Sequence, residues 1–260
     1  MKHILFLLLV TATFTACNNE EKQPQKLLRI NLNGQNLEGN VERYEESSST
    51  VDSTGASKAD ASIYISDFDK KGYQTFYVTK DPAGKLIEEV SFTRYESGQM
   101  KGFISKDGEG KQTLRWKITI DSNGKYNGAT IFDSAGRVTS VWKDLTQNEY
   151  YQIPSGTEYN EDGSIKSSFA YTYDKGIYIG GWVKDSSGKE YFRDALTLND
   201  KRDAIAETRT TVTKDITKTE KFTFQFDAYD EKGNWTQMTT YNEKGKPTKV
   251  TKRTFTYYKD

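Results

Sequence analysis

Apolar and polar residues alternate with a period of two along much of the chain. Phe222, Phe224 and Phe226 alternate with polar residues, and residues 115–120 and 168–173 repeat the pattern. This period places alternate side chains on opposite faces of a β-strand. No ten-residue stretch carries a helical apolar stripe, and residues 200–208, the nearest approach to one, are expected to form a loop or short turn. The pattern predicts an all-β protein.

Turn signals of the form Asp/Asn-x-x-Gly separate these strands. Successive glycines from Gly84 to Gly136 are 14, 12, 14 and 12 residues apart, which leaves room for one strand and one turn. Asp or Asn opens a tight turn through its side chain, and glycine takes the left-handed position that closes it. The repeat turns include Asp81 with Gly84, Asp121 with Gly124, Asp133 with Gly136, Asp230 with Gly233, and Asn242 with Gly245. We therefore expect an elongated antiparallel meander of repeated hairpins, forming a single-layer or weakly curled sheet.

The turn sequences also carry a family resemblance. Tyr229-Asp230-Glu-Lys-Gly233-Asn234 and Tyr241-Asn242-Glu-Lys-Gly245-Lys246 resemble the Tyr-Asp (YD) repeats of the Rhs family, and in style they are similar to MORN-like repeat proteins. The resemblance implies a β-sheet shell or a surface-exposed β array. The toxin-delivery role of the long Rhs proteins is not expected, because the chain ends at Asp260 without room for a toxin domain.

The first residues read as an export signal. Lys2 gives a basic start, residues 4–10 are an unbroken apolar run, and small residues precede Cys17. This order is typical of a cleaved signal peptide, and Phe14-Thr15-Ala16-Cys17 resembles the lipobox of bacterial lipoproteins. The resemblance implies lipidation at Cys17, with palmitate among the attached acyl chains. Glu20 and Glu21 resemble the acidic tethers of some surface-exposed lipoproteins, or belong to an ordinary linker.

The expected organisation has three parts. Residues 1–16 are the signal peptide, residues 17–26 are the lipidated cysteine with a flexible tether, and residues 27–260 are the β-repeat domain, in which residues 47–60 are expected to form a mobile loop. The expected location is the outer membrane of a Gram-negative bacterium, facing the periplasm or the cell surface. The membrane would be contacted through the N-terminal lipid.

Composition narrows the classes of function. The 37 basic and 37 acidic residues balance, so electrostatics gives no reason to expect a nucleic-acid partner. Aromatic residues reach 13%, which suits the half-buried faces of a sheet and predicts a thin core.

Several catalytic classes are excluded by missing residue types. The only histidine is His3, inside the expected signal, and the only cysteine is Cys17. The remainder therefore lacks the side chains for Ser-His-Asp or Cys-His catalysis and for histidine-based zinc sites. Asp67 to Gly72 begins like a calcium loop, but Lys71 stands where an oxygen ligand is needed. We expect no catalytic residues, no metal site and no cofactor.

Four tryptophans are the candidate binding residues. Trp116, Trp142, Trp182 and Trp235 lie on separate expected strands, and rings exposed on a sheet bind sugars or peptides well. Core packing is the alternative for each. Exposure is expected most at Trp182 and Trp235, which lie near turns. Asp133-Ser134-Ala135 resembles a bacterial O-glycosylation sequon, which would make Ser134 the acceptor.

These observations predict a lipid-anchored envelope protein with a non-catalytic binding or structural role, whose β-surface meets a glycan or an envelope protein. A carboxylate-dependent polysaccharide hydrolase is one alternative, and it requires a deep cleft that holds two acids and a tryptophan. An immunity or antitoxin-like repeat protein is another.

Overall fold

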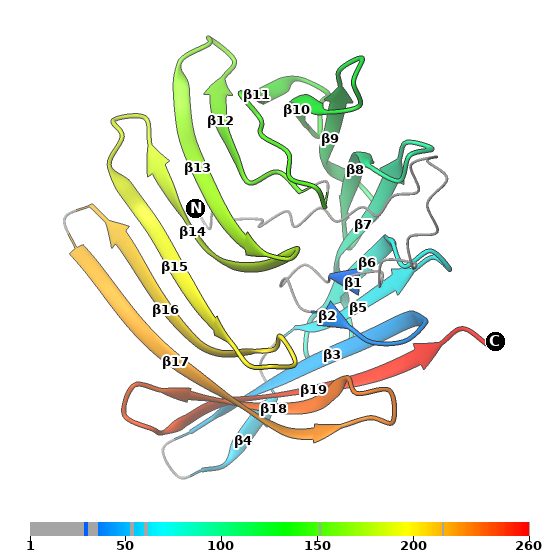
Figure 1. The fold of residues 1–260 in the computed structure, drawn as a ribbon, viewed down its shortest axis with the longest axis vertical. Helices are drawn as coiled ribbons and strands as arrows, with labels where there is room; N and C mark the ends of the chain where they lie inside the picture. The colour runs from blue at the N-terminus through cyan, green and yellow to red at the C-terminus, as the bar shows by residue number, and fades with distance from the viewer. Residues whose placement is uncertain are drawn as a thin grey trace.

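The sheet closes into a barrel (Figure 1). The computed structural model describes residues 29–30, 36–52, 55–59, 62–150, 152–214 and 216–259. In these ranges sixteen strands, β3 and β5 to β19, form one closed antiparallel ring. The expected signal peptide, Cys17 and the tether lie outside the described residues. No helix long and apolar enough to cross a membrane occurs in the described ranges.

The strand bounds follow the turn signals of the sequence. The strands are β1 (Arg29–Ile30), β2 (Asn36–Leu37), β3 (Val41–Val51), β4 (Ser57–Ala59), β5 (Ile63–Phe68), β6 (Gln74–Lys80), β7 (Leu86–Arg94), β8 (Met100–Asp107), β9 (Gln112–Ile120), β10 (Tyr126–Asp133), β11 (Val138–Lys143), β12 (Ser155–Asn160), β13 (Ile165–Asp174), β14 (Ile177–Asp185), β15 (Glu190–Leu198), β16 (Ala204–Thr213), β17 (Ile216–Tyr229), β18 (Trp235–Asn242) and β19 (Pro247–Tyr257).

The connectivity is the expected meander, but the expected open or weakly curled sheet is wrong. From β5 to β19 each strand pairs with the next one along the chain. The ring closes where β19 pairs with β3, with Thr251 opposite Ser48 and Phe255 opposite Tyr44. Closure removes the two unpaired edges that an open sheet would expose to water.

Two segments expected to be loops are partly strands. β3 continues to Val51 and β4 begins at Ser57, so strand pairing occupies much of the segment 47–60. Residues 204–208 belong to β16, where Ala206 faces Thr223 of β17. In the first segment a run of Ser and Thr concealed the strand, and in the second the charged residues 200–203 directly before β16 concealed its start.

The repeat turns share one geometry. At the turn between β9 and β10 the Gly124 N–H donates to the Asp121 carbonyl (3.0 Å), and the Lys125 N–H donates to Asp121 Oδ1 (2.8 Å). Gly124 has a φ of 74°, which is the left-handed conformation that glycine adopts without strain. Bonds of both kinds recur at Asp81 with Gly84, Asp133 with Gly136, Asp230 with Gly233, and Asn242 with Gly245.

An aromatic belt runs around much of the inner wall. It consists of ten rings in which successive ring centres are 4.6 to 6.0 Å apart. In order they are Tyr44, Tyr64, Tyr77, Phe92, Phe103, Trp116, Trp142, Phe169, Tyr171 and Tyr178. Tyr44 and Tyr77 are 2% exposed or less, which a single-walled barrel permits only on its inner face.

Small residues let the belt cross two strands that contribute no ring. β10 places Ala129 beside Trp142 and Ile118, and this short side chain leaves room for Trp116 to reach Trp142. β12 places Gly156 opposite Phe169, where a Cβ would lie only 2.9 Å from the Phe169 ring. Alternation of large and small residues therefore keeps the inner wall packed.

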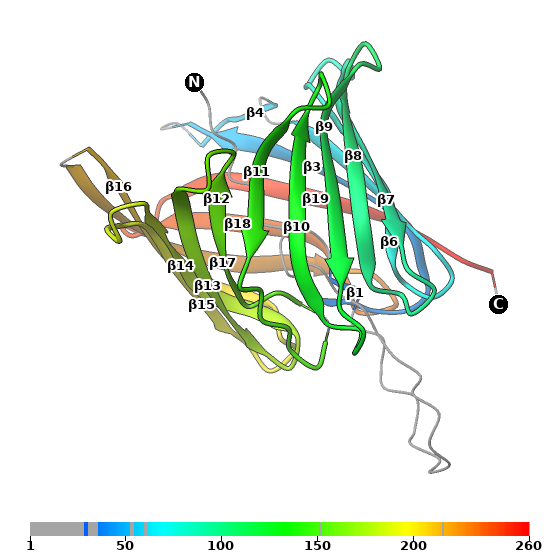
Figure 2. The same cartoon turned by 90° about the horizontal axis from the view of Figure 1, so that it is seen from above.

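The strands end at two opposite rims (Figure 2), and side chains bond the turns differently at each. At one, here called the bonded rim, side chains join neighbouring turns. The bonds, in order around this rim, are Arg94 to the Gln74 carbonyl, Gln99 to the Gly124 carbonyl, Gln147 accepting from the Tyr126 N–H, Gln152 to the Gly176 carbonyl, Arg202 to the Asp174 carbonyl, Asn234 to the Glu38 carbonyl, and Tyr258 to the Phe68 carbonyl. At the opposite rim, here called the free rim, the turn glycines, Gly84, Gly110, Gly136, Gly163, Gly188 and Gly245, are exposed. At the free rim the described side-chain bonds between turns are fewer, and they include that of Lys189 to the Lys214 carbonyl (3.2 Å).

Candidate functional site

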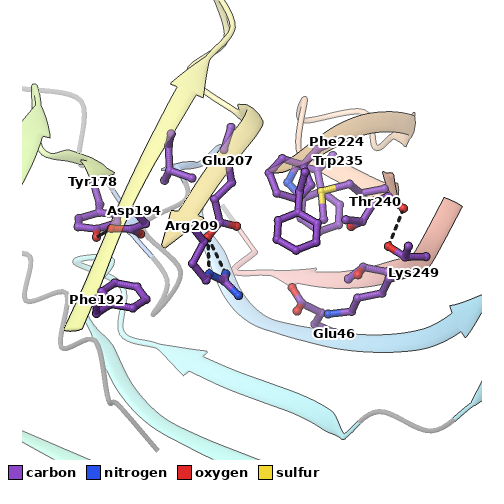
Figure 3. Close-up of a pocket in the computed structure, with 16 residues that line it drawn as sticks. Glu46, Tyr178, Phe192, Asp194, Glu207, Arg209, Phe224, Trp235, Thr240 and Lys249 are labelled. Atoms are coloured by element: carbon purple, nitrogen blue, oxygen red, sulfur yellow. Dashed lines mark hydrogen bonds and ion pairs between the residues drawn. The ribbon is translucent and has the colours of Figure 1, made fainter. Parts of the chain in front are cut away.

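A cavity of about 590 Å³ lies inside the barrel, against β14 to β19 and β3 (Figure 3). Sixteen strands enclose a barrel too wide for wall side chains to fill completely. The lining combines aromatic, charged and hydroxyl groups, and its members on the inner wall alternate with outward residues. A partly open hollow lined by rings and a few polar groups is a candidate ligand site.

Aromatic rings form one part of the lining. Phe192, Phe222 and Phe224 are partly exposed, so their rings can meet a ligand. Trp235 is only 3% exposed, because the Arg253 guanidinium lies 3.5 Å from its ring centre and Phe226 packs beside it. The phenylalanines therefore supply the contact surface, and Trp235 supports the wall.

The charged groups of the cavity lie among these rings. Arg209 forms an ion pair with Glu207, in which Arg209 Nη2 is 2.6 Å from Glu207 Oε1. Arg253 forms a second ion pair with Glu46, in which Arg253 Nη2 is 2.7 Å from Glu46 Oε2. The Tyr178 hydroxyl donates to Asp194. Burial raises the pKa of the Asp194 carboxyl above its usual value. Burial also raises the pKa of Glu207, against the opposing effect of Arg209. Partly desolvated polar groups of this kind fix the orientation of a ligand more strongly than exposed ones.

The outer wall has the opposite character. On β9, Arg115 and Lys117 point outward and are exposed. The alternate residues, Trp116 and Ile118, point inward and are buried. Charged outward positions recur on many strands, namely Arg43, Glu45, Asp67, Glu89, Lys106, Lys143, Lys184, Arg193, Lys221 and Lys252. Barrels that span a membrane carry an apolar outer band and a polar interior. This wall has the polarity of a barrel surrounded by water.

The four tryptophans do not form one surface. Trp116 and Trp142 belong to the aromatic belt, and Trp235 is buried in the cavity wall instead of exposed. Trp182 lies on the outer wall under the Lys184 ammonium, which is 4.4 Å from its ring centre. The buried indole N–H groups of Trp116 and Trp142 have no hydrogen-bond partner, and the two rings meet edge to face.

The remaining predicted residues lie at rims or outside the described ranges. Gly84, Gly136 and Gly245 are at the free rim, and Gly124 and Gly233 are at the bonded rim. Ser134 is exposed in the turn between β10 and β11. Cys17 lies outside the described residues. Among the side chains that the structure describes, no group of three His, Cys, Asp or Glu residues is arranged to hold a metal.

The sequence-based interpretation missed the charged residues of the cavity. The sequence does contain an indication of them. The inward positions of β15 are Phe192, Asp194 and Leu196, so a carboxylate stands between two apolar residues on the same face. β16 likewise places Glu207 and Arg209 at inward positions. Charged residues in the buried phase of a strand indicate pairing or function, since an isolated buried charge is costly.

Comparisons with known proteins support the fold. No protein-family model matches the chain, and no curated protein matches its sequence. The chain is similar to the crystal structure of a porin-like protein from Bacteroides uniformis, at 12% identity and a TM-score of 0.53, over 83% of this chain and 96% of that one. A TcdB2-TccC3-Cdc42 structure matches at 10% identity and a TM-score of 0.30, over 79% of this chain and 16% of that one. The first likeness agrees with an all-β closed barrel, and the second is too low to support an argument about the Rhs resemblance.

Proposed function

We propose that the protein is a non-catalytic glycan-binding protein of the Gram-negative cell envelope, which takes its ligand into the barrel. The observation that carries this proposal is the cavity, where Phe192, Phe222 and Phe224 lie beside Asp194 and the Glu207–Arg209 pair. A sugar has apolar C–H faces and polar hydroxyl edges. Flat rings beside hydrogen-bonding groups complement both.

The proposed location rests on two features. The residues before Cys17 resemble a lipoprotein signal. Because the outer wall is charged, we propose that the protein is attached to the membrane by a lipid on Cys17 and not by the barrel wall. We propose that this lipid holds the barrel at the outer membrane. Cys17→Ala is expected to move the protein from the membrane fraction to the aqueous fraction. Retention of this variant in washed membranes would contradict the anchor.

A glycan array probed with the full chain tests the binding proposal. Phe222→Ala removes a ring from the cavity and is expected to abolish or strongly weaken binding. Trp182→Ala removes a ring from the outer wall and is the matched control, which should bind normally. Circular dichroism checks that both variants keep the β-sheet. Binding that survives Phe222→Ala and is lost in Trp182→Ala would place recognition outside the barrel.

The hydrolase alternative gains one observation. Asp194 lies opposite Arg209, so Glu207 on the same inner face is its diagonal neighbour. Diagonal positions are about 7 to 8 Å apart at the backbone, which is comparable with the separation of about 5 to 10 Å between the two carboxyl groups of a glycosidase. We favour binding because Arg209 holds Glu207 and the Tyr178 hydroxyl holds Asp194. Release of reducing sugar from a bound glycan, lost in Asp194→Asn, would favour the hydrolase.

A further inference from the structure

The charges of the cavity are unevenly paired. The lining residue Glu46 pairs with Arg253, whose side chain is 1% exposed and lies outside the lining, and Arg209 pairs with Glu207 within it, at distances of 2.7 and 2.6 Å. Two further charged side chains, Asp194 and Lys249, line the same cavity and take part in no ion pair within the described ranges. The two pairs cancel, so these two groups decide which charges a ligand meets.

Asp194 makes one side of the cavity negative. It faces Arg209 across the β15–β16 pairing, but Arg209 donates to Glu207 Oε1 through both Nε (2.8 Å) and Nη2 (2.6 Å). The groups that donate to Asp194 are neutral, namely the Tyr178 hydroxyl and backbone N–H groups, including that of Gly181. This side therefore holds two carboxylates and one guanidinium, a net charge of −1 when all are ionised.

Lys249 makes the other side positive. It lies on β19 at an inward position, opposite Thr50 and Thr240, and is half-buried. Its ammonium bonds to no described side chain, although the neighbouring Thr248 hydroxyl donates to the Thr240 carbonyl (3.2 Å). With Glu46 and Arg253 paired, this side carries a net charge of +1.

The two unpaired groups are too far apart to neutralise each other. Asp194 is on β15 and Lys249 on β19, four inter-strand steps apart. At about 4.8 Å a step, the path along the wall is about 19 Å. Figure 3 shows Asp194 on one side of the cavity and Lys249 on the other, with Glu207, Arg209 and Glu46 drawn between them. A half-buried charge without a partner is stabilised when a ligand supplies the opposite charge.

We propose that the ligand is a dipolar oligosaccharide, which directs an amino group to Asp194 and a carboxylate to Lys249. This inference rests on the proposed glycan-binding function and specifies its ligand. Because Asp194 and Lys249 lie on strands four steps apart, we infer a ligand of more than one sugar. Its middle rings contact Phe222 and Phe224, which lie on the strand between the two charged sides.

Calorimetric titration of the full chain with three tetrasaccharides tests the inference. The probes are a tetrasaccharide of alternating glucuronic acid and glucosamine, its N-acetylated form without amines, and its carboxyl-reduced form without carboxylates. The unmodified probe is expected to bind best, and removal of either charge should weaken binding about tenfold or more.

Three variants assign the charges to their partners. Asp194→Asn should remove the preference for the free amine and keep the preference for the carboxylate. Lys249→Gln should do the reverse. Lys252→Gln, on the outward face of the same strand, is the control and should change neither preference.

The outcomes separate the two proposals. Equal binding of all three probes, or no binding of any probe while neutral glycans bind on the array, would overturn the dipolar ligand and leave glycan binding intact. Failure of every glycan on the array would overturn the proposed function itself, and the dipolar ligand with it.

Discussion

Trp116 and Trp142 meet edge to face across an intervening strand, with ring centres 4.6 Å apart and ring planes at 76°. The two large rings on β9 and β11 touch across β10, where Trp116 lies opposite Ile131 and Trp142 lies opposite the small residue Ala129. The contact makes the aromatic belt continuous from β8 to β13, since Phe103 lies on one side of the pair and Phe169 on the other. The small side chain of Ala129 therefore allows this part of the core to pack.

Ala129→Leu is expected to break the contact. Ala129 is 2% exposed, so the added carbons have no free space and must push the indoles apart, at a cost of about 1 to 3 kcal/mol of unfolding free energy. Urea unfolding measures this loss, and near-ultraviolet circular dichroism reports the changed tryptophan environment. Thr130→Leu, outward on the same strand, is the control. Equal stability of both variants would contradict the packing argument.

Tryptophan truncation is expected to separate the inner wall from the outer wall. Trp116→Ala removes a residue that is 8% exposed and should lower the unfolding free energy by about 3 to 5 kcal/mol. Trp182→Ala removes a contact with Lys184 on the outer wall and should cost about 1 kcal/mol or less. Denaturant titration of the two variants measures the difference. Similar losses would mean that Trp182 is part of the core after all.

The bonded rim makes a prediction at Asn234. The Glu38 N–H donates to Asn234 Oδ1 (2.6 Å), and Asn234 Nδ2 donates to the Glu38 carbonyl (2.9 Å), which fastens the segment before β3 to the turn before β18. Asn234→Ala leaves both backbone groups without these partners and should destabilise the fold by about 2 to 3 kcal/mol. Asn123→Ala, at an exposed turn position, is the control. Hydrogen exchange should show the largest loss of protection at residues 36–41, and unchanged protection there would refute the role of this bridge.

Two glycines should respond differently to the same change. A Cβ on Gly102 would lie 2.2 Å from the Trp116 carbonyl oxygen, so Gly102→Ala must displace β9 and should cost about 3 kcal/mol. Gly136 has a φ of 79° and open space around it, so Gly136→Ala should cost only the backbone strain, about 1 kcal/mol. Thermal unfolding of the pair checks the order. A larger loss of stability in Gly136→Ala than in Gly102→Ala would contradict the prediction that Gly102 is the more crowded position.

The buried carboxyl groups predict a pH dependence. Burial raises the pKa values of Asp194 and Glu207 in the folded protein, so the folded state binds protons more tightly than the unfolded state. Their effect on stability is therefore most favourable at low pH and declines as the pH rises from about 4 through the raised pKa values. Asp194→Asn removes one such group, and its unfolding free energy relative to the unsubstituted protein should increase between about pH 4 and pH 7. Asp200→Asn, at an exposed carboxyl, controls for the change of charge. A relative stability that falls over this range would have the wrong sign.

The sequence predicted most of the strands and turns but not the closure of the sheet. Alternation around Trp116 and the Asp121–Gly124 signal are local, because each depends on residues within one hairpin. Closure depends on Thr251 meeting Ser48, which are about two hundred positions apart, and a meander has the same local pattern whether it is open or closed. The cavity was missed for a similar reason. Asp194 and Lys249 share a space only after the ring has formed.

Ring closure has a consequence for how copies of this protein behave beside one another. The chain displays long, threonine-rich strands at the surface, and strands of this kind pair readily with a second molecule when their backbone is free. Here β3 and β19, which would be the outermost strands of an open meander, use their N–H and C=O groups on each other. The described ring offers no such long template, so crowding on a surface should not lead to strand-by-strand self-association.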